Sequence, residues 1–102
     1  MEVHQQHQYA AIDSGASGHF YPNNYEGARH DSTADPIRVG CANKGVMESL
    51  AADIIYFDKL PLEAKKCHKF REIWLPFLSV PQLCKANLTV TFKGETVEVK
   101  LS

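Results

Sequence analysis

The chain has 102 residues, of which 44% are hydrophobic and 23% charged, as in one ordinary globular domain. The formal net charge of −1 argues against a broad basic face for nucleic acid, and no apolar run approaches the roughly 18 residues that span a bilayer. Because a domain this small buries a limited share of its surface, pairing with a second copy is an expected source of stability. The polar stretch Met1–His7 lacks a signal-peptide core, so we expect a cytoplasmic protein that does not bind membranes.

The three cysteines, Cys41, Cys67 and Cys84, are odd in number and widely spaced, which favours reduced thiols over a disulfide framework. Cys67 and His68 with Cys84 or His30 would be one conceivable zinc set. None of these residues has the short paired spacing of structural zinc sites. We therefore expect no metal and no cofactor.

The first third of the chain predicts a flexible lead-in over residues 1–8, followed by one domain over residues 9–102. Tyr9–Ile12 is an apolar run of strand length that stops at Asp13. Tyr21–Pro36 is rich in Asn, Asp, Ser, Gly and Pro, which indicates a long surface loop.

The middle of the chain predicts a β-hairpin made of Ile37–Cys41 and Val46–Ala52. Asn43 and Gly45 are expected to supply the positive φ that the reversal between them needs.

The remaining elements alternate short strands with two Pro-initiated helical turns. They are strands over Asp53–Phe57, Cys67–Trp74 and Phe77–Val80, helical turns over Pro61–Lys66 and Pro81–Lys85, and a hairpin of Leu88–Phe92 and Thr96–Leu101 with strict period-two alternation. This pattern predicts an all-β sandwich or barrel. Trp74, Phe70 and Phe77 are expected in its core.

The segment with the most chemical information runs from Ala11 to Phe20, where an apolar strand leads directly into Asp13-Ser14-Gly15-Ala16. On its own, Asp-Ser-Gly predicts an Asx turn that caps a strand. A carboxylate at a strand end, followed by small residues that let another chain approach, is also an arrangement suited to catalysis.

The sequence Asp13-Ser14-Gly15-Ala16-Ser17, followed by His19-Phe20, resembles the active-site motif of aspartic proteases from copia-type retrotransposons, which are retropepsins. Leu60–Ala64 with Cys67-His68 resembles the middle of that domain, and Leu78–Cys84 followed by Val90–Phe92 resembles its second signature. The resemblance covers about residues 10–99. Leu75–Leu78 departs from it, because retropepsins usually carry Gly and then Arg or Asn there.

The resemblance implies a closed retropepsin-like β-barrel with one short helix that is functional as a C2 homodimer. Its catalytic residues would be Asp13, Ser14 and Gly15, with two Asp13 carboxylates sharing a proton around one water. Ser14 would bond across the two-fold axis, and Gly15 would permit the turn. His19 would have a packing or hydrogen-bonding role.

The hairpin from Ile37 to Ala52 is the expected flap over an extended peptide. The expected substrate-binding residues lie on this hairpin and after the catalytic turn. They are Ala16, Ser17, Gly40, Cys41, Ala42, Val46 and Met47. The hairpin from Leu88 to Leu101 is expected either inside the sheet or at the dimer interface.

Three functions remain open at this point. The resemblance implies an endopeptidase that cuts its own retrotransposon polyprotein in the cytoplasm or in virus-like particles, with a second copy and extended peptide segments as its partners. The alternatives are a catalytically silent module for dimerisation or peptide binding, and a cellular retropepsin-like protease domain.

Overall fold

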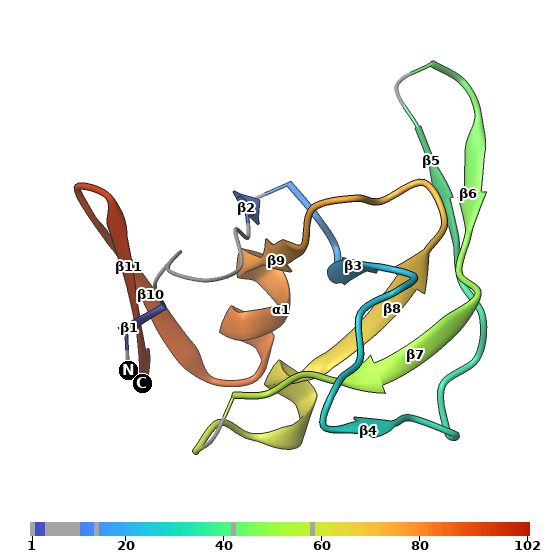
Figure 1. Cartoon of the computed structure of the whole chain (residues 1–102). Coiled ribbons are helices and arrows are strands. Elements are labelled where there is room, and N and C mark those ends of the chain that lie inside the picture. The colour runs from blue at the N-terminus through green and yellow to red at the C-terminus, as the bar shows by residue number, and fades with distance from the viewer. Residues whose placement is uncertain (1, 4–10, 14, 42, 58) are drawn as a thin grey trace.

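The computed structural model describes residues 2–3, 11–13, 15–41, 43–57 and 59–102 (Figure 1). Its strands are β1 (Glu2–Val3), β2 (Ala11–Asp13), β3 (His19–Pro22), β4 (Arg29–His30), β5 (Arg38–Gly40), β6 (Val46–Glu48), β7 (Ala51–Ile54), β8 (Lys66–Phe70), β9 (Phe77–Ser79), β10 (Leu88–Lys93) and β11 (Thr96–Leu101). A 3₁₀ turn, η1 (Leu62–Ala64), precedes β8, and one α-helix, α1 (Val80–Lys85), follows β9. The mostly β fold with one short helix is therefore confirmed.

The described strands form three separate sheets rather than one closed barrel. The largest has the order β2-β9-β3-β8-β7-β4, the second has the order β1-β11-β10, and β5 pairs only with β6. The large sheet ends in β2 and β4 as edge strands, so the predicted barrel closure is wrong for the single chain. Of the predicted lead-in, Glu2 and Val3 form β1 beside β11, and the other residues lie outside the described part.

The C-terminal hairpin forms as its alternation predicts. Leu88 pairs with Leu101 and Val90 with Val99, so one face of β10 and β11 is apolar. This face packs on η1 and α1 around Ala64 and Leu83, both nearly fully buried. The turn uses Gly94, whose φ of +56° favours glycine.

Helix α1 begins and ends with the expected signals. The Ser79 hydroxyl caps it by accepting a hydrogen bond from the Gln82 amide at 3.1 Å, and a proline lies in the first turn. Asn87, with φ of 67°, ends it in the left-handed region. The predicted helix over Pro81–Lys85 is thus confirmed to within one residue.

Two strands were missed inside the predicted loop, and one predicted strand is shifted. β4 and the end of β3 lie within Tyr21–Pro36. Both strands are short, and the many turn-forming residues of this segment favour a loop prediction. The return strand over Val46–Ala52 is interrupted at Ser49, and Ala51 already begins β7, which ends before Phe57.

A second core lies in the large sheet, where Tyr21, Ile55, Cys67 and Leu78 are buried together. Phe70 is also fully buried, with its ring 5.1 Å from the ring of Phe20 in a T-shaped contact. Trp74, by contrast, is 84% exposed, so its predicted place in the core is wrong. The segment that carries it lies beyond the end of β8, where the chain turns back toward β9.

The remaining general features concern membranes, thiols and charge. Across the part of the chain that the structure describes, no helix is long and apolar enough to cross a membrane.

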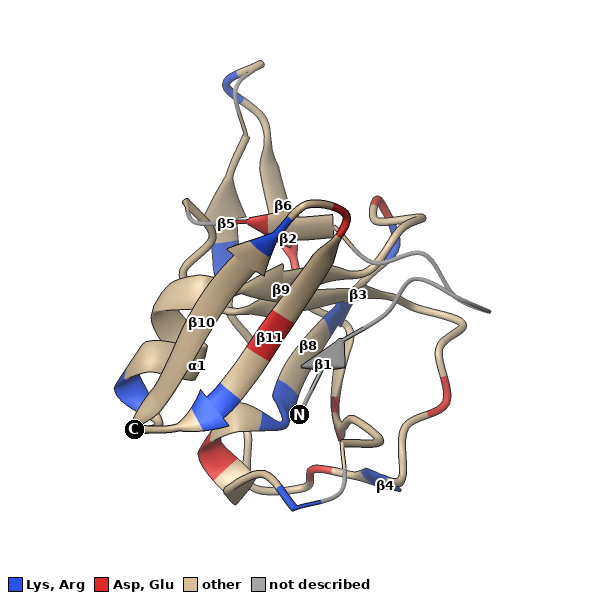
Figure 2. Cartoon of the chain, turned by 90° about the vertical axis from the view of Figure 1, so that its left-hand side faces the viewer, with Lys and Arg blue, Asp and Glu red and all other residues tan. Residues whose placement is uncertain are grey.

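Cys41, Cys67 and Cys84 are free thiols. Figure 2 shows basic and acidic residues scattered over the side formed by β10 and β11, where Glu98 lies 3.2 Å from both Lys93 and Lys100.

Candidate functional site

Asp13 is the last residue of β2, at the edge of the large sheet. β2 runs parallel to β9, and the ladder places Asp13 opposite Ser79. Because both strands end at this point, the Asp13 turn lies beside the start of α1, which follows Ser79 directly (Figure 1).

Asp13 and Gly15 are joined by a short polar contact. The Gly15 amide donates a hydrogen bond of 2.7 Å to Asp13 Oδ1, which is the Asx-turn geometry expected of Asp-Ser-Gly. A Cβ at Gly15 would lie 3.3 Å from the same carboxylate oxygen, a tight contact for any side chain. The hydrogen bond from the Gly15 amide orients the Asp13 carboxylate toward its own backbone. Ser14, predicted to bond across a two-fold axis, lies outside the described residues.

The next residues divide between the interior and the surface. Ala16 is buried, and its carbonyl accepts a 2.6 Å hydrogen bond from the Ser79 hydroxyl. Ser17 is exposed. Within one chain, therefore, Ala16 anchors the turn and Ser17 faces outward.

Two further side chains hold the turn against β9 and α1. Gln82 Oε1 accepts a 2.8 Å bond from the His19 amide, and the Ser79 amide donates a 2.8 Å bond to His19 Nδ1. From the sequence, the apolar segment Phe77–Val80 is expected to pack under the Asp13 turn, whereas no hydrogen-bonding role is predicted for Ser79 or Gln82. Their spacing, Ser-x-x-Gln, is that of a capping box, which was the available signal. Here the Gln82 side chain reaches His19 rather than the Ser79 amide.

The predicted flap forms a separate two-stranded hairpin. Figure 1 shows β5 and β6 projecting away from the body on the side of β7 and β8. Gly40 and Val46 are exposed, Cys41 and Met47 are half-buried, and Ala42 lies outside the described residues.

The tip and base of this hairpin are both hydrogen-bonded. At the tip, the Cys41 amide donates to the Gly45 carbonyl at 2.8 Å, and the positive φ of 67° falls on Lys44, not on Asn43 or Gly45 as predicted. At the base, buried Ser49 exchanges two bonds with Ile37, through its hydroxyl at 2.8 Å and its amide at 2.9 Å.

The structure thus brings the predicted residues together in two groups. Asp13, Gly15 and Ala16 form one group around Ser79, and the hairpin residues form the other. Among the described residues, no hydrogen bond joins the two groups.

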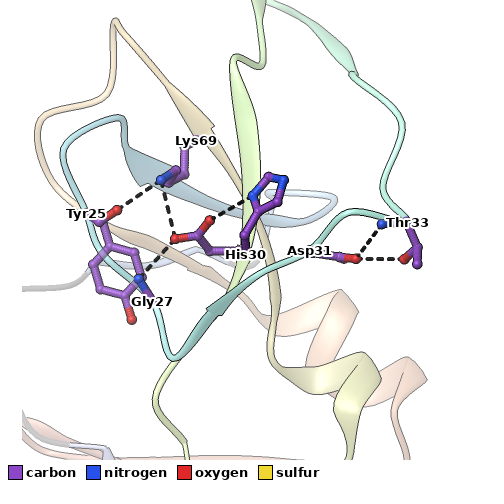
Figure 3. Close-up of polar contacts among 7 residues, drawn as sticks. Tyr25, Gly27, His30, Asp31, Thr33 and Lys69 are labelled. Atoms are coloured by element: carbon purple, nitrogen blue, oxygen red, sulfur yellow. Dashed lines mark hydrogen bonds and ion pairs between the residues drawn. The ribbon is translucent and has the colours of Figure 1, made fainter.

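A buried polar cluster lies away from Asp13, around Asp53 on β7. Figure 3 shows Lys69, Gly27 and His30 around one carboxylate, and the contacts identify it as that of Asp53. Lys69 Nζ lies 3.3 Å from it and also donates to the Tyr25 carbonyl at 3.0 Å, and the Gly27 amide donates to it at 3.0 Å. His30 Nδ1 lies 3.6 Å away. These contacts fasten the segment between β3 and β4 to the sheet.

A groove of about 570 Å³ lies between that segment and the chain before β9. Its walls include Tyr25 and Glu26 on one side and Trp74, Leu75 and Pro76 on the other. Asp13 is not among its lining residues.

Neither a metal site among the described residues nor a similar known protein was found. Within the described ranges, no three His, Cys, Asp or Glu side chains lie together in a way that could hold a metal ion. No protein-family model matches the sequence, and no curated protein or solved structure is significantly similar to it.

Proposed function

We propose that this chain is one subunit of a homodimeric aspartic endopeptidase in which Asp13 supplies half of the catalytic pair. The observation that carries the proposal is the place of Asp13, at the end of a short strand in the motif Asp-Ser-Gly-Ala, with its carboxylate fixed by the Gly15 amide at 2.7 Å. The resemblance of residues 10–99 to copia-type retropepsins supports the same reading.

The chemistry requires two carboxylates around one water. One carboxylate accepts a proton from the water as it attacks the peptide carbonyl, while the other donates a proton to the carbonyl oxygen. Asp13 is the single Asp-Ser-Gly aspartate in the sequence. A two-fold symmetric pair would supply the second one, because each subunit of an isologous dimer presents the same surface.

The edge position of β2 supports such pairing. A turn at a sheet edge is open to a second copy, and the residues after Asp13 are small. The hydrogen bonds that Ser79 donates and Gln82 accepts hold this turn from the side of its own chain, so that approach of a second copy need not reorganise it.

The β5–β6 hairpin supports an extended peptide as the substrate class. Its strands pair only with each other among the described elements, so it can add main-chain hydrogen bonds to a peptide that lies beneath it. The side chains of this peptide would then contact four residues of the hairpin, namely Gly40, Cys41, Val46 and Met47. The polyprotein of a retrotransposon is the substrate that the family resemblance implies.

Peptide-library cleavage with three proteins tests the proposal. The wild-type chain is expected to cut peptides at mildly acidic pH, and a pepstatin-like transition-state mimic is expected to stop it. Asp13→Asn is expected to abolish cleavage, because an amide cannot take the proton from water. Asp35→Asn, which changes an exposed loop aspartate, is the matched control and should remain active.

Two outcomes would overturn the proposal. Cleavage that survives Asp13→Asn would show that the peptidase mechanism is not aspartic. A wild-type chain that binds extended peptides but never cuts them would instead support the catalytically silent module.

A further inference from the structure

The ring of His19 joins three elements around the Asp13 turn. Its side chain is 1% exposed, and both ring nitrogens are hydrogen-bonded. Nδ1 lies 2.8 Å from the Ser79 amide at the end of β9, and Nε2 lies 2.8 Å from the Ala64 carbonyl in η1.

These partners fix the tautomer of the ring. A backbone amide can only donate, so Nδ1 must be the unprotonated acceptor. A carbonyl can only accept, so Nε2 must carry the proton. Burial lowers the pKa of His19 to about 4, which keeps the ring neutral and Nδ1 free to accept near neutral pH.

The main chain of His19 is held as firmly as its ring. Its amide donates to Gln82 Oε1 at 2.8 Å. Gln82 Nε2 in turn donates to the carbonyls of Glu63 and Lys66 at 2.9 and 2.7 Å. Through the Gln82 side chain of α1, the segment that follows the Asp13 turn is therefore hydrogen-bonded to the same residue as η1 and β8.

Of the hydrogen bonds that His19 makes, the one from the Ser79 amide connects it to the partner of Asp13 in the sheet. Ser79 stands opposite Asp13 in the β2–β9 ladder, and its hydroxyl holds the Ala16 carbonyl at 2.6 Å. The His19 ring thus fixes the same residue that fixes the turn. A shift of Ser79 would move Asp13 and Ala16 together.

We propose that His19 is a positioning residue of the catalytic turn, whose Nδ1, through Ser79, holds Asp13 in the geometry that catalysis needs. This inference rests on the proposed peptidase function. His19 itself touches neither substrate nor water in this role, since its ring is buried and both nitrogens are already bonded within the chain.

Two conservative variants, His19→Asn and His19→Gln, test the hydrogen bonds of the two ring nitrogens separately. Asn at position 19 places an acceptor where Nδ1 lies and keeps the bond from the Ser79 amide. Gln places a donor where Nε2 lies and keeps the bond to the Ala64 carbonyl. Each variant loses one buried hydrogen bond, so a purely structural role predicts similar effects from both. A positioning role through Ser79 predicts different ones.

The activity measurement compares kcat and KM for the same peptide. His19→Asn is expected to keep kcat within about tenfold of wild type, and His19→Gln to lose about 100-fold, the cost of a misplaced catalytic group. KM is expected to change little in either variant, because the flap is untouched. His30→Asn, at a histidine whose side chain is 66% exposed, is the control and should keep its activity.

A second measurement needs no activity. Nitrogen-15 NMR of the wild-type ring at pH 7 is expected to show the neutral Nε2–H tautomer. The Gly15 and Ala16 amide resonances should move more in His19→Gln than in His19→Asn.

The outcomes separate failure of this inference from failure of the proposed function. An active enzyme in which His19→Gln retains as much kcat as His19→Asn would overturn the positioning role alone. A charged ring or the Nδ1–H tautomer at pH 7 would overturn it as well. An inactive wild-type chain would overturn the peptidase proposal, and the positioning of the turn would then be decided by the amide resonances.

Discussion

Ser79 lies directly opposite Asp13 in the parallel ladder between β2 and β9, and its hydroxyl donates a 2.6 Å hydrogen bond to the Ala16 carbonyl. The same hydroxyl accepts from the Gln82 amide and so caps α1. One buried side chain therefore connects the turn after Asp13 to the helix behind it.

Removal of the Ser79 hydroxyl is expected to lower the free energy of unfolding. Ser79→Ala removes a helix cap, worth about 1 kcal/mol, and leaves the buried Ala16 carbonyl without its donor, at about 1–3 kcal/mol. We expect the free energy of unfolding, measured by urea denaturation, to fall by about 2–4 kcal/mol. Ser32→Ala, at an exposed loop serine, should change it by less than about 0.5 kcal/mol. Equal values for the two variants would contradict the role of Ser79.

Gly27 allows the segment between β3 and β4 to approach β7 closely. A Cβ there would lie 2.5 Å from the Ile54 carbonyl oxygen and 2.9 Å from the Asp53 Cβ. Gly27→Ala is therefore expected to lower the free energy of unfolding by about 1–3 kcal/mol. Gly40→Ala, where a Cβ would meet nothing within 4 Å, is the control. A thermal melt in which both variants match wild type would show that the close approach is not required.

The buried His19 ring makes stability depend on pH. Its pKa is lowered to about 4 in the folded chain from an ordinary value of 6.5, so the unfolded chain binds more protons between these values. The stabilising contribution is complete above pH 6.5 and is lost as pH falls toward 4. Since one pKa unit corresponds to about 1.4 kcal/mol, the loss is on the order of 3 kcal/mol.

Urea titrations at pH 7.0, 5.5 and 4.5 measure this loss. His19→Asn, which has no ionisable group at this position, should show a flatter profile than wild type over that range. Carboxylates with lowered pKa values, such as that of Glu98, act in both proteins and cancel in the comparison. Parallel profiles would show that His19 is not the buried group responsible.

Ser49 fastens the base of the β5–β6 hairpin to the body. Ser49→Ala removes the acceptor for the Ile37 amide, which the hydroxyl now contacts at 2.8 Å. Hydrogen exchange of the amides over residues 38–48 is expected to accelerate while the free energy of unfolding falls by only about 1 kcal/mol. The proposed flap role of the hairpin predicts that KM of an active enzyme rises as well. Unchanged exchange in the hairpin would show that the base is held by other contacts.

Local patterns predicted the parts of the fold that depend on neighbours in sequence. The β10–β11 hairpin follows from period-two alternation around Gly94, and α1 follows from the proline in its first turn. The parallel pairing of Asp13 with Ser79 joins residues 66 positions apart and carries no local signal.

Two wrong predictions have separate physical causes. The predicted return strand is divided after Ser49. Ser49 still bonds to Ile37 in line with the β5–β6 pairing, whereas the next amide, that of Leu50, donates to the Lys69 carbonyl of β8. Trp74 was placed in the core because aromatic residues are usually buried, but the chain turns between β8 and β9 and leaves it at the surface. At the candidate site, the Asx turn at Asp13 could be predicted from Asp-Ser-Gly, whereas the hydrogen bonds of Ser79 and Gln82 depend on the tertiary structure.

The proposed requirement for two Asp13 carboxylates from two chains is tested most directly by mixing wild-type chain with Asp13→Asn chain. At equal amounts and at concentrations where sedimentation shows dimers, about half of the wild-type chains pair with an inactive mate. The peptidase activity per wild-type chain should then fall to about half, and further as the variant is added in excess. Activity that stays constant across the whole mixing series would contradict a shared active site.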